Sequence, residues 1–309
     1  MPDDPLQRDD RLSMVERLAA RRLASGPMPV SAPILAPIQA SPVFAAPEPP
    51  PPLQPDPPPL SVPVAKPADP ARPPLPIDFD RLQAAGFITP TSPRSQQIEC
   101  FRAIKRALRR IAFPEGTAER ETNSNVIMVT SAVAGEGKTF VALNLAMSFC
   151  LERDLFVLLI DGDSHRRSLG SWLGAETEPG LVDLLAGDAH DVGDIIRRTS
   201  VPNLSVMPAG RPHAHGTELL SSKQMGALMR DVGARYADRI IIIDTAPVLA
   251  TNEGVALSAH VGQTVLVVEK DATTKRNLRE ALAKLKGGRN LSCVFNRVTD
   301  EHSFADGGY

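Results

Sequence analysis

The segment Thr130–Ala146, TSAVAGEGKTFVALNLA, combines residue types that suit the binding of a phosphate group. Gly135 and Gly137 let backbone amides turn toward an anion without a Cβ in the way. The helix expected after them directs the positive end of its dipole at that anion. Lys138 can reach the β- and γ-phosphates of a nucleotide, and the Thr139 hydroxyl can bind Mg²⁺. The pattern predicts a nucleotide site, with a plain strand-to-helix turn as the alternative.

The segment departs at one place from the usual Gly-x-x-x-x-Gly-Lys-Ser/Thr pattern, because Ala132 replaces the first glycine. The remaining positions keep the residue types that the chemistry needs. We therefore expect the nucleotide to contact a continuous stretch of the chain, made up of Ala134, Gly135, Glu136, Gly137, Lys138, Thr139 and Phe140.

Three aspartates follow apolar runs that predict buried strands. VLLIDGD places Asp161 and Asp163 after one strand, and IIIIDTAP places Asp244 after another. In a fold with a phosphate-binding loop, an aspartate at the end of a strand holds Mg²⁺ directly or through water. Each aspartate alone could instead cap a helix. Together with Lys138 and Thr139 they favour a site for a magnesium-bound nucleotide.

Runs of Val, Ile and Leu without polar alternation predict strands that are buried on both faces, as in a parallel sheet. These runs are NVIMVTS, LFVLLID, LSVMPAG, RIIIIDTAP, QTVLVVEK and LSCVFN. Helical stretches such as Phe140–Glu152 and Thr217–Tyr236 lie between them, which predicts βαβ units with right-handed crossovers. The fold class is therefore α/β, with a mainly parallel central sheet and helices on both faces. Ligands of such sheets lie beyond the carboxyl ends of the strands.

Composition divides the chain into four parts. Residues 1–26 contain an amphipathic helix pattern with a Ser-x-x-Glu capping box; so short a helix needs a partner surface, and a solvated tail is the alternative. Residues 27–76 hold 20 of the 30 prolines, cannot pack as a core, and are interpreted as a disordered, semi-rigid tether. Alternatively, this segment is a ligand for a domain that binds proline-rich sequences. Residues 77–299 form the α/β domain, and residues 300–309 a flexible C-terminal tail.

The overall composition narrows the class of protein. A net charge of −2 over 309 residues gives no global field that would attract nucleic acid, so we expect no nucleic-acid partner. Three scattered cysteines lack metal-ligand spacing and suit a reducing cytoplasm. The opening MPDDPLQRDDR has no apolar core, so no signal peptide is expected, and no apolar run approaches the ~18 residues that cross a bilayer. We expect a cytoplasmic protein that reaches the inner membrane only through a partner.

Several segments taken together resemble one known family. They are AVAGEGKT, VLLIDGD, IIIIDTAP, IECFRAIKRAL and the stretch Pro208–Ser222. Over residues 77–298 the chain resembles the bacterial protein tyrosine kinases of exopolysaccharide export, and more narrowly the stand-alone tyrosine autokinases that accompany exosortase systems. The resemblance implies a P-loop NTPase fold, ATP and Mg²⁺ as cofactors, and a non-specific protein-tyrosine kinase. It also places Asn296 where related folds contact the adenine ring.

The resemblance implies a role for each residue of the expected site. Lys138 and Thr139 would hold the phosphates and Mg²⁺. Asp161 would lie next to Mg²⁺ and accept the proton of the tyrosine hydroxyl, while Asp163 would orient Mg²⁺ or the incoming hydroxyl. Asp244 would bind Mg²⁺ through water. The implied catalytic set is thus Lys138, Asp161 and Asp163, and the implied metal set is Thr139, Asp161 and Asp244.

The resemblance also implies an assembly. Glu99, Arg102 and Lys105 match a Glu-x-x-Arg-x-x-Arg oligomerisation motif with lysine at the last place, and a solvated helix face is the alternative. Members of the family form rings in which the tail of one subunit enters the active site of its neighbour. The implied partner is a membrane chain-length-determinant protein with a cytoplasmic tail.

The chain departs from the family in its tail and after the aspartates. The family ends in a tyrosine cluster, whereas TDEHSFADGGY offers Tyr309 alone as the phosphoacceptor; Tyr236, at the end of a helical stretch, is interpreted as structural. The family shows Asp-x-Asp-x-Arg, but here His165 takes the place of the arginine and is followed by Arg166. We interpret His165 as a surface loop residue. The pair of histidines in GRPHAHGTELL, His213 and His215, is likewise interpreted as a loop, because no carboxylate or thiol has suitable spacing.

Two other functions remain open from the sequence. A partition-type or septum-site ATPase of the same fold would carry a second lysine at the place of Val133, and that lysine is absent. A non-catalytic, nucleotide-bound adaptor of the membrane partner would explain the depleted tyrosine tail. The favoured function is an ATP-dependent tyrosine autokinase that regulates exopolysaccharide polymerisation and export.

Overall fold

The computed structural model of the chain describes residues 72–115, 119–152 and 154–298. The expected helix within residues 1–26, the greater part of the tether 27–76 and the tail 300–309 lie outside the described residues. Among the described residues, no helix is both long and apolar enough to cross a membrane.

A single sheet of seven strands runs through the described part of the chain, in the order β3-β4-β2-β5-β1-β6-β7. All neighbouring strands pair in parallel except β3, which is antiparallel to β4. The strands are β1 (Val126–Ser131), β2 (Phe156–Gly162), β3 (Arg197–Arg198), β4 (Leu204–Met207), β5 (Arg239–Thr245), β6 (Gln263–Glu269) and β7 (Leu291–Asn296). The expected α/β class and mainly parallel sheet are confirmed. The sequence missed β3, which is two arginines long and carries no apolar run.

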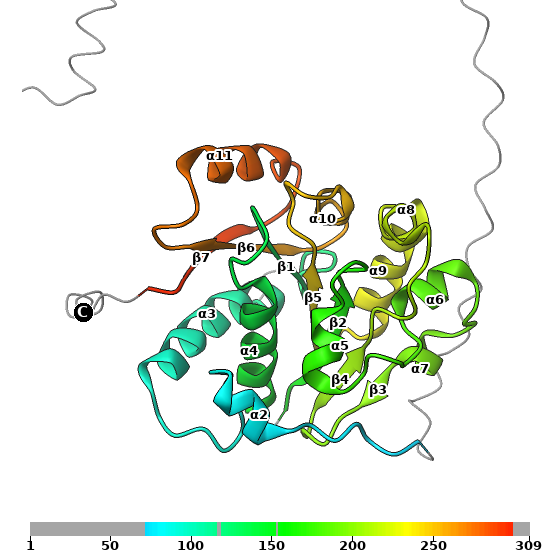
Figure 1. The fold of residues 1–309 in the computed structure, drawn as a ribbon, viewed down its shortest axis with the longest axis horizontal. Coiled ribbons are helices and arrows are strands. Elements are labelled where there is room, and N and C mark those ends of the chain that lie inside the picture. Colours follow the sequence, from blue (N-terminus) through cyan, green and yellow to red (C-terminus); the bar gives the residue numbers. More distant parts are fainter. Residues whose placement is uncertain (1–71, 116–118, 153, 299–309) are drawn as a thin grey trace, which may run out of the picture. The chain divides into compact units, whose positions relative to one another are not determined.

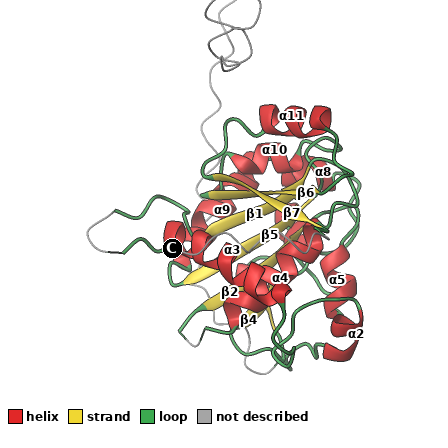
Figure 2. Cartoon of the chain, turned by 90° about the vertical axis from the view of Figure 1, so that its left-hand side faces the viewer, coloured by secondary structure: helices red, strands yellow, loops and turns green. Residues whose placement is uncertain are grey.

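Helices cover both faces of the sheet (Figures 1 and 2). One face packs against α2 (Phe79–Ala84), α3 (Gln96–Ala112), α4 (Lys138–Cys150) and α5 (Ser168–Leu173). The other face packs against α6 (Leu181–Ala186), α7 (Val192–Ile195), α8 (Gly216–Leu220), α9 (Lys223–Arg235), α10 (Glu253–Ser258) and α11 (Lys275–Lys284).

Each central strand serves two cores. In β1 the side chains of Ile127 and Val129 enter the core beside α3 and α4, while Val126 and Met128 enter the core beside α9 and α10. Successive side chains of a strand point to opposite faces, so a strand covered on both sides must be apolar at every position. This is why the strand sequences read as continuous apolar runs.

The helical stretch expected over Thr217–Tyr236 is two helices. α8 ends before Ser221, and α9 starts anew after Ser222, whose side chain accepts a hydrogen bond from the Met225 amide at 3.2 Å. A serine oxygen in this place satisfies a free amide of the first turn, so the chain can turn and restart the helix. This break between α8 and α9 could not be predicted from the periodicity of the apolar residues.

The first described residues, although expected within the tether, pack against the edge of the sheet. Leu75 forms a bridge with Thr199, donating to the Arg198 carbonyl at 2.9 Å and accepting from the Ser200 amide at 2.8 Å. Arg72 pairs with Glu178 at 2.7 Å. The packed chain thus begins before residue 77.

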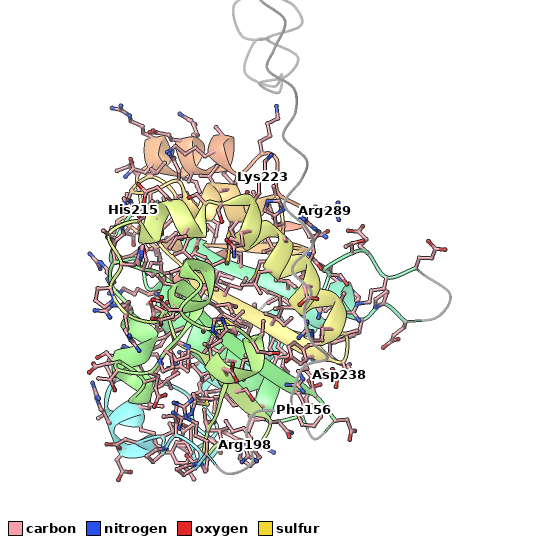
Figure 3. The ribbon with its side chains drawn as sticks, turned by 90° about the vertical axis from the view of Figure 1, so that its right-hand side faces the viewer. Phe156, Arg198, His215, Lys223, Asp238 and Arg289 are labelled. Carbon is pink, nitrogen blue, oxygen red and sulfur yellow. The ribbon has the colours of Figure 1, made fainter. Side chains whose placement is uncertain are left out.

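The amino ends and the carboxyl ends of the parallel strands lie on opposite sides of the molecule. Phe156 and Asp238, at the amino ends of β2 and β5, lie on one side of the molecule, and His215 lies on the opposite side, before α8 (Figure 3). The carboxyl ends of the parallel strands therefore meet on the side of α8, where the loops after β1, β2 and β5 lie.

Candidate active site

The loop between β1 and α4 has the backbone of an anion cradle. Gly135 and Gly137 have φ angles of 97° and 91°, in the left-handed region that favours glycine. A Cβ on Gly137 would overlap the side-chain amide of Asn296, so a larger residue there would displace that side chain. The amide nitrogen Nδ2 of Asn296 donates to the Glu136 carbonyl at 2.9 Å. Asn296 from β7 is therefore bonded to the phosphate-binding loop.

The side chain of Glu136 turns back onto its own loop and is 2% exposed. Its Oε2 accepts from the Val133 amide at 2.8 Å, and its Oε1 accepts from the Thr273 hydroxyl. Both carboxylate oxygens of Glu136 are thus bonded within the protein, so only the backbone of this residue is available to a phosphate. Sequence reasoning missed Thr273, which follows β6 and lies far from the loop along the chain.

The three aspartates meet the loop at the carboxyl ends of β1, β2 and β5. Lys138 Nζ donates to Asp163 Oδ2 at 2.9 Å, and Thr139 Oγ1 donates to Asp244 Oδ2 at 2.6 Å. Asp161 lies opposite Asp244 in the register of β2 with β5. All three carboxylates are buried, with at most 1% exposure. The five residues that the sequence predicts for catalysis and metal binding therefore converge at one place.

Burial and mutual repulsion shift the pKa values of the carboxyl groups. Burial, followed by the charge of Asp244, raises the pKa of Asp161 to about 7. Burial raises the pKa of Asp244 to about 6, although the charge of Lys138 opposes the shift. For Lys138, burial acts downward, but the charges of Asp244 and Asp163 outweigh it and the pKa lies above its ordinary value. The site is a buried excess of negative charge around one ammonium group.

The residues present fit a magnesium ion that is shared with phosphate. The described chain contains no group of three His, Cys, Asp or Glu side chains able to hold a metal ion by themselves. Magnesium in nucleotide sites takes only one or two protein ligands and completes its shell with phosphate and water. The Thr139 hydroxyl suits that role, as does Oδ1 of Asp244, which is buried without a partner among the described residues.

A cavity of about 690 Å³ opens beside the first turn of α4. Gly137, Phe140 and Asn296 are among the residues that line it, and Phe101 and Val298 contribute apolar side chains. A cavity lined by aromatic and aliphatic side chains together with the amides of Gln96, Gln97 and Asn296 suits a flat aromatic ring. The resemblance implies that Asn296 contacts the adenine ring, and this cavity is the space beside that side chain.

The three residues expected to mediate oligomerisation do not share one surface. Glu99 and Arg102 pair with each other at 2.6 Å on the exposed side of α3. Lys105 is buried, pairs with Glu152 at 2.9 Å and donates to the Ser148 carbonyl at 3.1 Å. Lys105 thus joins α3 to the end of α4 within the same chain.

The other residues singled out in the sequence occupy non-catalytic positions. His213 and His215 are exposed on the loop before α8, as expected. Tyr236 is partly buried against the core and lies beneath the guanidinium of Arg239, in agreement with a structural role. His165 is exposed, as expected, with its Nε2 3.1 Å from the Thr217 hydroxyl.

Comparison with known proteins decides the family. A model of a family described as "AAA domain" matches residues 124–287, more than half of the chain. The chain belongs to the AAA domain family. The matched region contains the phosphate-binding loop and all three aspartates.

Curated relatives of this AAA domain chain are bacterial tyrosine-protein kinases. It is 28% identical to "Tyrosine-protein kinase wzc" of Salmonella typhi, over 74% of this chain and 31% of the relative. It is 33% identical to "Tyrosine-protein kinase ptk" of Acinetobacter johnsonii, over 53% of this chain and 22% of the relative. The chain therefore spans less than a third of the length of these relatives.

Solved kinase domains share the fold. The BceF tyrosine kinase domain is 27% identical with a TM-score of 0.58, over 70% of this chain and 86% of that chain. The kinase domain of VpsO is 29% identical with a TM-score of 0.54, over 66% of this chain and 100% of that chain. The expected relation to bacterial tyrosine kinases is confirmed.

Proposed function

We propose that this chain is an ATP-dependent protein tyrosine autokinase that transfers the γ-phosphate of ATP to tyrosine and regulates exopolysaccharide polymerisation and export. The observation that carries the proposal is the convergence of Lys138 and Thr139 with three buried carboxylates at one edge of the sheet. Phosphoryl transfer needs mainly positioning and charge neutralisation, and these groups supply both. The names of the relatives support tyrosine as the acceptor class.

In this proposal Lys138 exchanges partners when a nucleotide binds. Its ammonium is paired with Asp163 in the nucleotide-free chain, at 2.9 Å. With a nucleotide bound, Lys138 would turn from Asp163 to the phosphates, which would leave the Asp163 carboxylate free to orient the incoming hydroxyl. Thr139, Asp161 and Asp244 would hold Mg²⁺, which neutralises charge on the phosphates when it is bound.

Asp161 is the proposed base. Without Mg²⁺, burial raises the pKa of Asp161 to about 7, and a Mg²⁺ ion beside the carboxylate would lower this pKa and favour the ionised form that can accept a proton. Asp161 accepts hydrogen bonds from the amides of Asp163 and Gly170 at 3.2 and 3.3 Å, which hold the carboxylate in one orientation. It would receive the proton of the tyrosine hydroxyl as the phosphoryl group is transferred.

The remaining parts of the proposal concern the binding of adenine and the assembly of subunits. The adenine ring would enter the cavity beside Phe140 and Asn296. Tyr309 of a neighbouring subunit would be the acceptor, within a ring to which Glu99 and Arg102 contribute. The tether would link this ring to the N-terminal region, and a membrane chain-length-determinant protein would hold the assembly at the inner membrane.

The test is incubation of the purified protein with Mg-ATP, followed by mass spectrometry of its two tyrosines. We expect phosphate on Tyr309, none after Lys138→Met or Tyr309→Phe, and full labelling after the control Tyr236→Phe. ATP binding without phosphotyrosine, even when the cytoplasmic tail of a chain-length-determinant protein is present, would overturn the proposal in favour of an adaptor or an ATPase switch.

A further inference from the structure

A buried carboxylate that the proposed chemistry does not use lies beside the active site. Glu253 is the first residue of α10 and is 2% exposed. Its Oε1 accepts from the Ser164 hydroxyl at 2.9 Å, and its Oε2 has no hydrogen-bond partner among the described residues. Burying a carboxylate with so few hydrogen-bond partners costs free energy of folding. The position of Glu253 therefore suggests a functional role that offsets this cost.

The partner of Glu253 belongs to the turn that presents Asp163. Ser164 follows Asp163 directly, and the turn is closed by the amides of Arg166 and Arg167, which donate to Asp163 Oδ1 and to its carbonyl, both at 2.9 Å. These bonds are internal to the turn. The bond from Ser164 to Glu253 connects the turn to a distant element, 89 residues away along the chain.

The helix that carries Glu253 also packs on the segment after Asp244. A Cβ on Gly254 would lie 3.3 Å from a methyl group of Val248 and 3.4 Å from the Ala246 carbonyl, so the first turn of α10 lies close against that segment. That segment is in turn bonded to the start of the phosphate-binding loop, because the Val248 amide donates to the Ser131 carbonyl at 2.9 Å. Glu253 therefore connects the Asp163 turn with the elements that carry Asp244 and Lys138.

The turn has little freedom to move on its other side. Gly216, the first residue of α8, faces Ser164 so closely that an added Cβ would lie 3.3 Å from the Ser164 Cβ. The serine is thus held between α8 and α10, with its hydroxyl directed at the carboxylate of Glu253.

We propose that Glu253 is a positioning residue, which acts through Ser164 to hold Asp163 in register with Lys138 and Asp244. Its effect on phosphoryl transfer rests on the function proposed above. Its effect on the binding of magnesium-nucleotide does not, because the turn follows Asp161 at the end of β2 and holds Asp163 against Lys138 in any nucleotide-binding use of the site.

The test is a double-mutant cycle in the full-length protein with Ser164→Ala, Glu253→Ala and the combined variant. Glu253→Gln keeps an acceptor for the Ser164 hydroxyl, and Glu218→Gln changes an exposed carboxylate on α8 as a matched control. The readouts are kcat and KM for autophosphorylation, the Mg²⁺ concentration that gives half-maximal binding of a fluorescent ATP analogue, and the free energy of unfolding. A purely structural residue would change only the last of these.

We expect each single alanine variant to lower kcat roughly 10-fold and to raise the half-saturating Mg²⁺ concentration by a similar factor, as for partners that orient metal-binding groups. The combined variant should match the single ones, because both act through one bond. Glu253→Gln should retain the greater part of kcat, and Glu218→Gln all of it.

Additive effects in the cycle, or variants that lose stability but keep kcat and the Mg²⁺ dependence, would overturn the inference. If the wild-type protein transfers no phosphate, the kinase proposal fails. The Mg²⁺ dependence of nucleotide binding then decides the role of Glu253: a rise in the alanine variants supports it, and an unchanged value rejects it.

Discussion

At the scale of single residues, the carboxyl groups at the ends of β2 and β5 make the stability of the nucleotide-free protein depend on pH. Their pKa values in the folded chain are about 7 for Asp161 and about 6 for Asp244, both raised from 3.8. Between these values and 3.8 the folded state binds more protons than the unfolded state. The free energy of unfolding therefore falls as pH rises through that window, since each carboxyl must ionise in a buried place.

We predict that Asp161→Asn removes a large part of this dependence. At pH 8 the free energy of unfolding of the variant should exceed that of the wild-type protein by about 2–4 kcal/mol, since each pKa unit corresponds to ~1.4 kcal/mol. At pH 4 the two free energies of unfolding should be nearly equal. Urea denaturation without nucleotide and with EDTA measures the difference. Asp238→Asn, an exposed aspartate before β5, is the control, and an equal effect of both variants would contradict the prediction.

The residues of the site were predictable to different degrees. Lys138 and Thr139 follow from a local pattern, and Asp161 and Asp244 follow from the rule that parallel strands end together. Glu253 could not be found in this way, because its bond to Ser164 joins positions 89 residues apart and Glu253 itself belongs to no local motif. Such contacts depend on how α10 packs, which the sequence does not display.

At the scale of elements, α3 is attached to α4 by a buried lysine rather than by apolar packing alone. Lys105 binds both Glu152 and the Ser148 carbonyl, while Arg109 adds a contact to Glu152 at 3.4 Å. The resemblance groups Lys105 with Glu99 and Arg102 as one motif, but the structure places them in different environments. Their substitutions should therefore have different effects.

We predict that Lys105→Met lowers the free energy of unfolding by about 1–3 kcal/mol, because the buried Ser148 carbonyl loses its donor. Arg102→Ala should change stability by no more than about 0.5 kcal/mol, as is usual for exposed side chains. It should instead reduce the size of the assembly. Denaturation and light scattering of both variants measure this, and loss of stability in Arg102→Ala with an intact assembly would reverse the assignment.

The elements themselves were largely predictable, for a physical reason that also explains the misses. Strands covered on both faces must be apolar throughout, so β1, β5 and β6 can be predicted from their continuous apolar runs. β3 is an edge strand of two arginines, held by one antiparallel neighbour and by Glu178, and has no such signal. The break between α8 and α9 depends on the cap of Ser222, which periodicity does not register.

At the scale of the whole molecule, the proposed kinase would control its own assembly. Phosphorylation of Tyr309 adds nearly two negative charges at a proposed subunit boundary. We predict that protein phosphorylated to completion elutes as a smaller assembly than unphosphorylated protein. Multi-angle light scattering measures both forms, with Tyr309→Phe treated with Mg-ATP as the control. Assemblies of one size in both forms would reject this mode of regulation.

The central claim is that one chain supplies the site and another supplies the tyrosine. The most direct measurement mixes Lys138→Met, which keeps the tyrosine but lacks the phosphate-binding lysine, with Tyr309→Phe, which keeps the site but lacks the acceptor. One variant is isotopically labelled, so that mass spectrometry can assign the phosphate. We predict phosphate on Tyr309 of the Lys138→Met chain in the mixture and in neither variant alone. An unmodified Tyr309 in a mixture that binds Mg-ATP would contradict it.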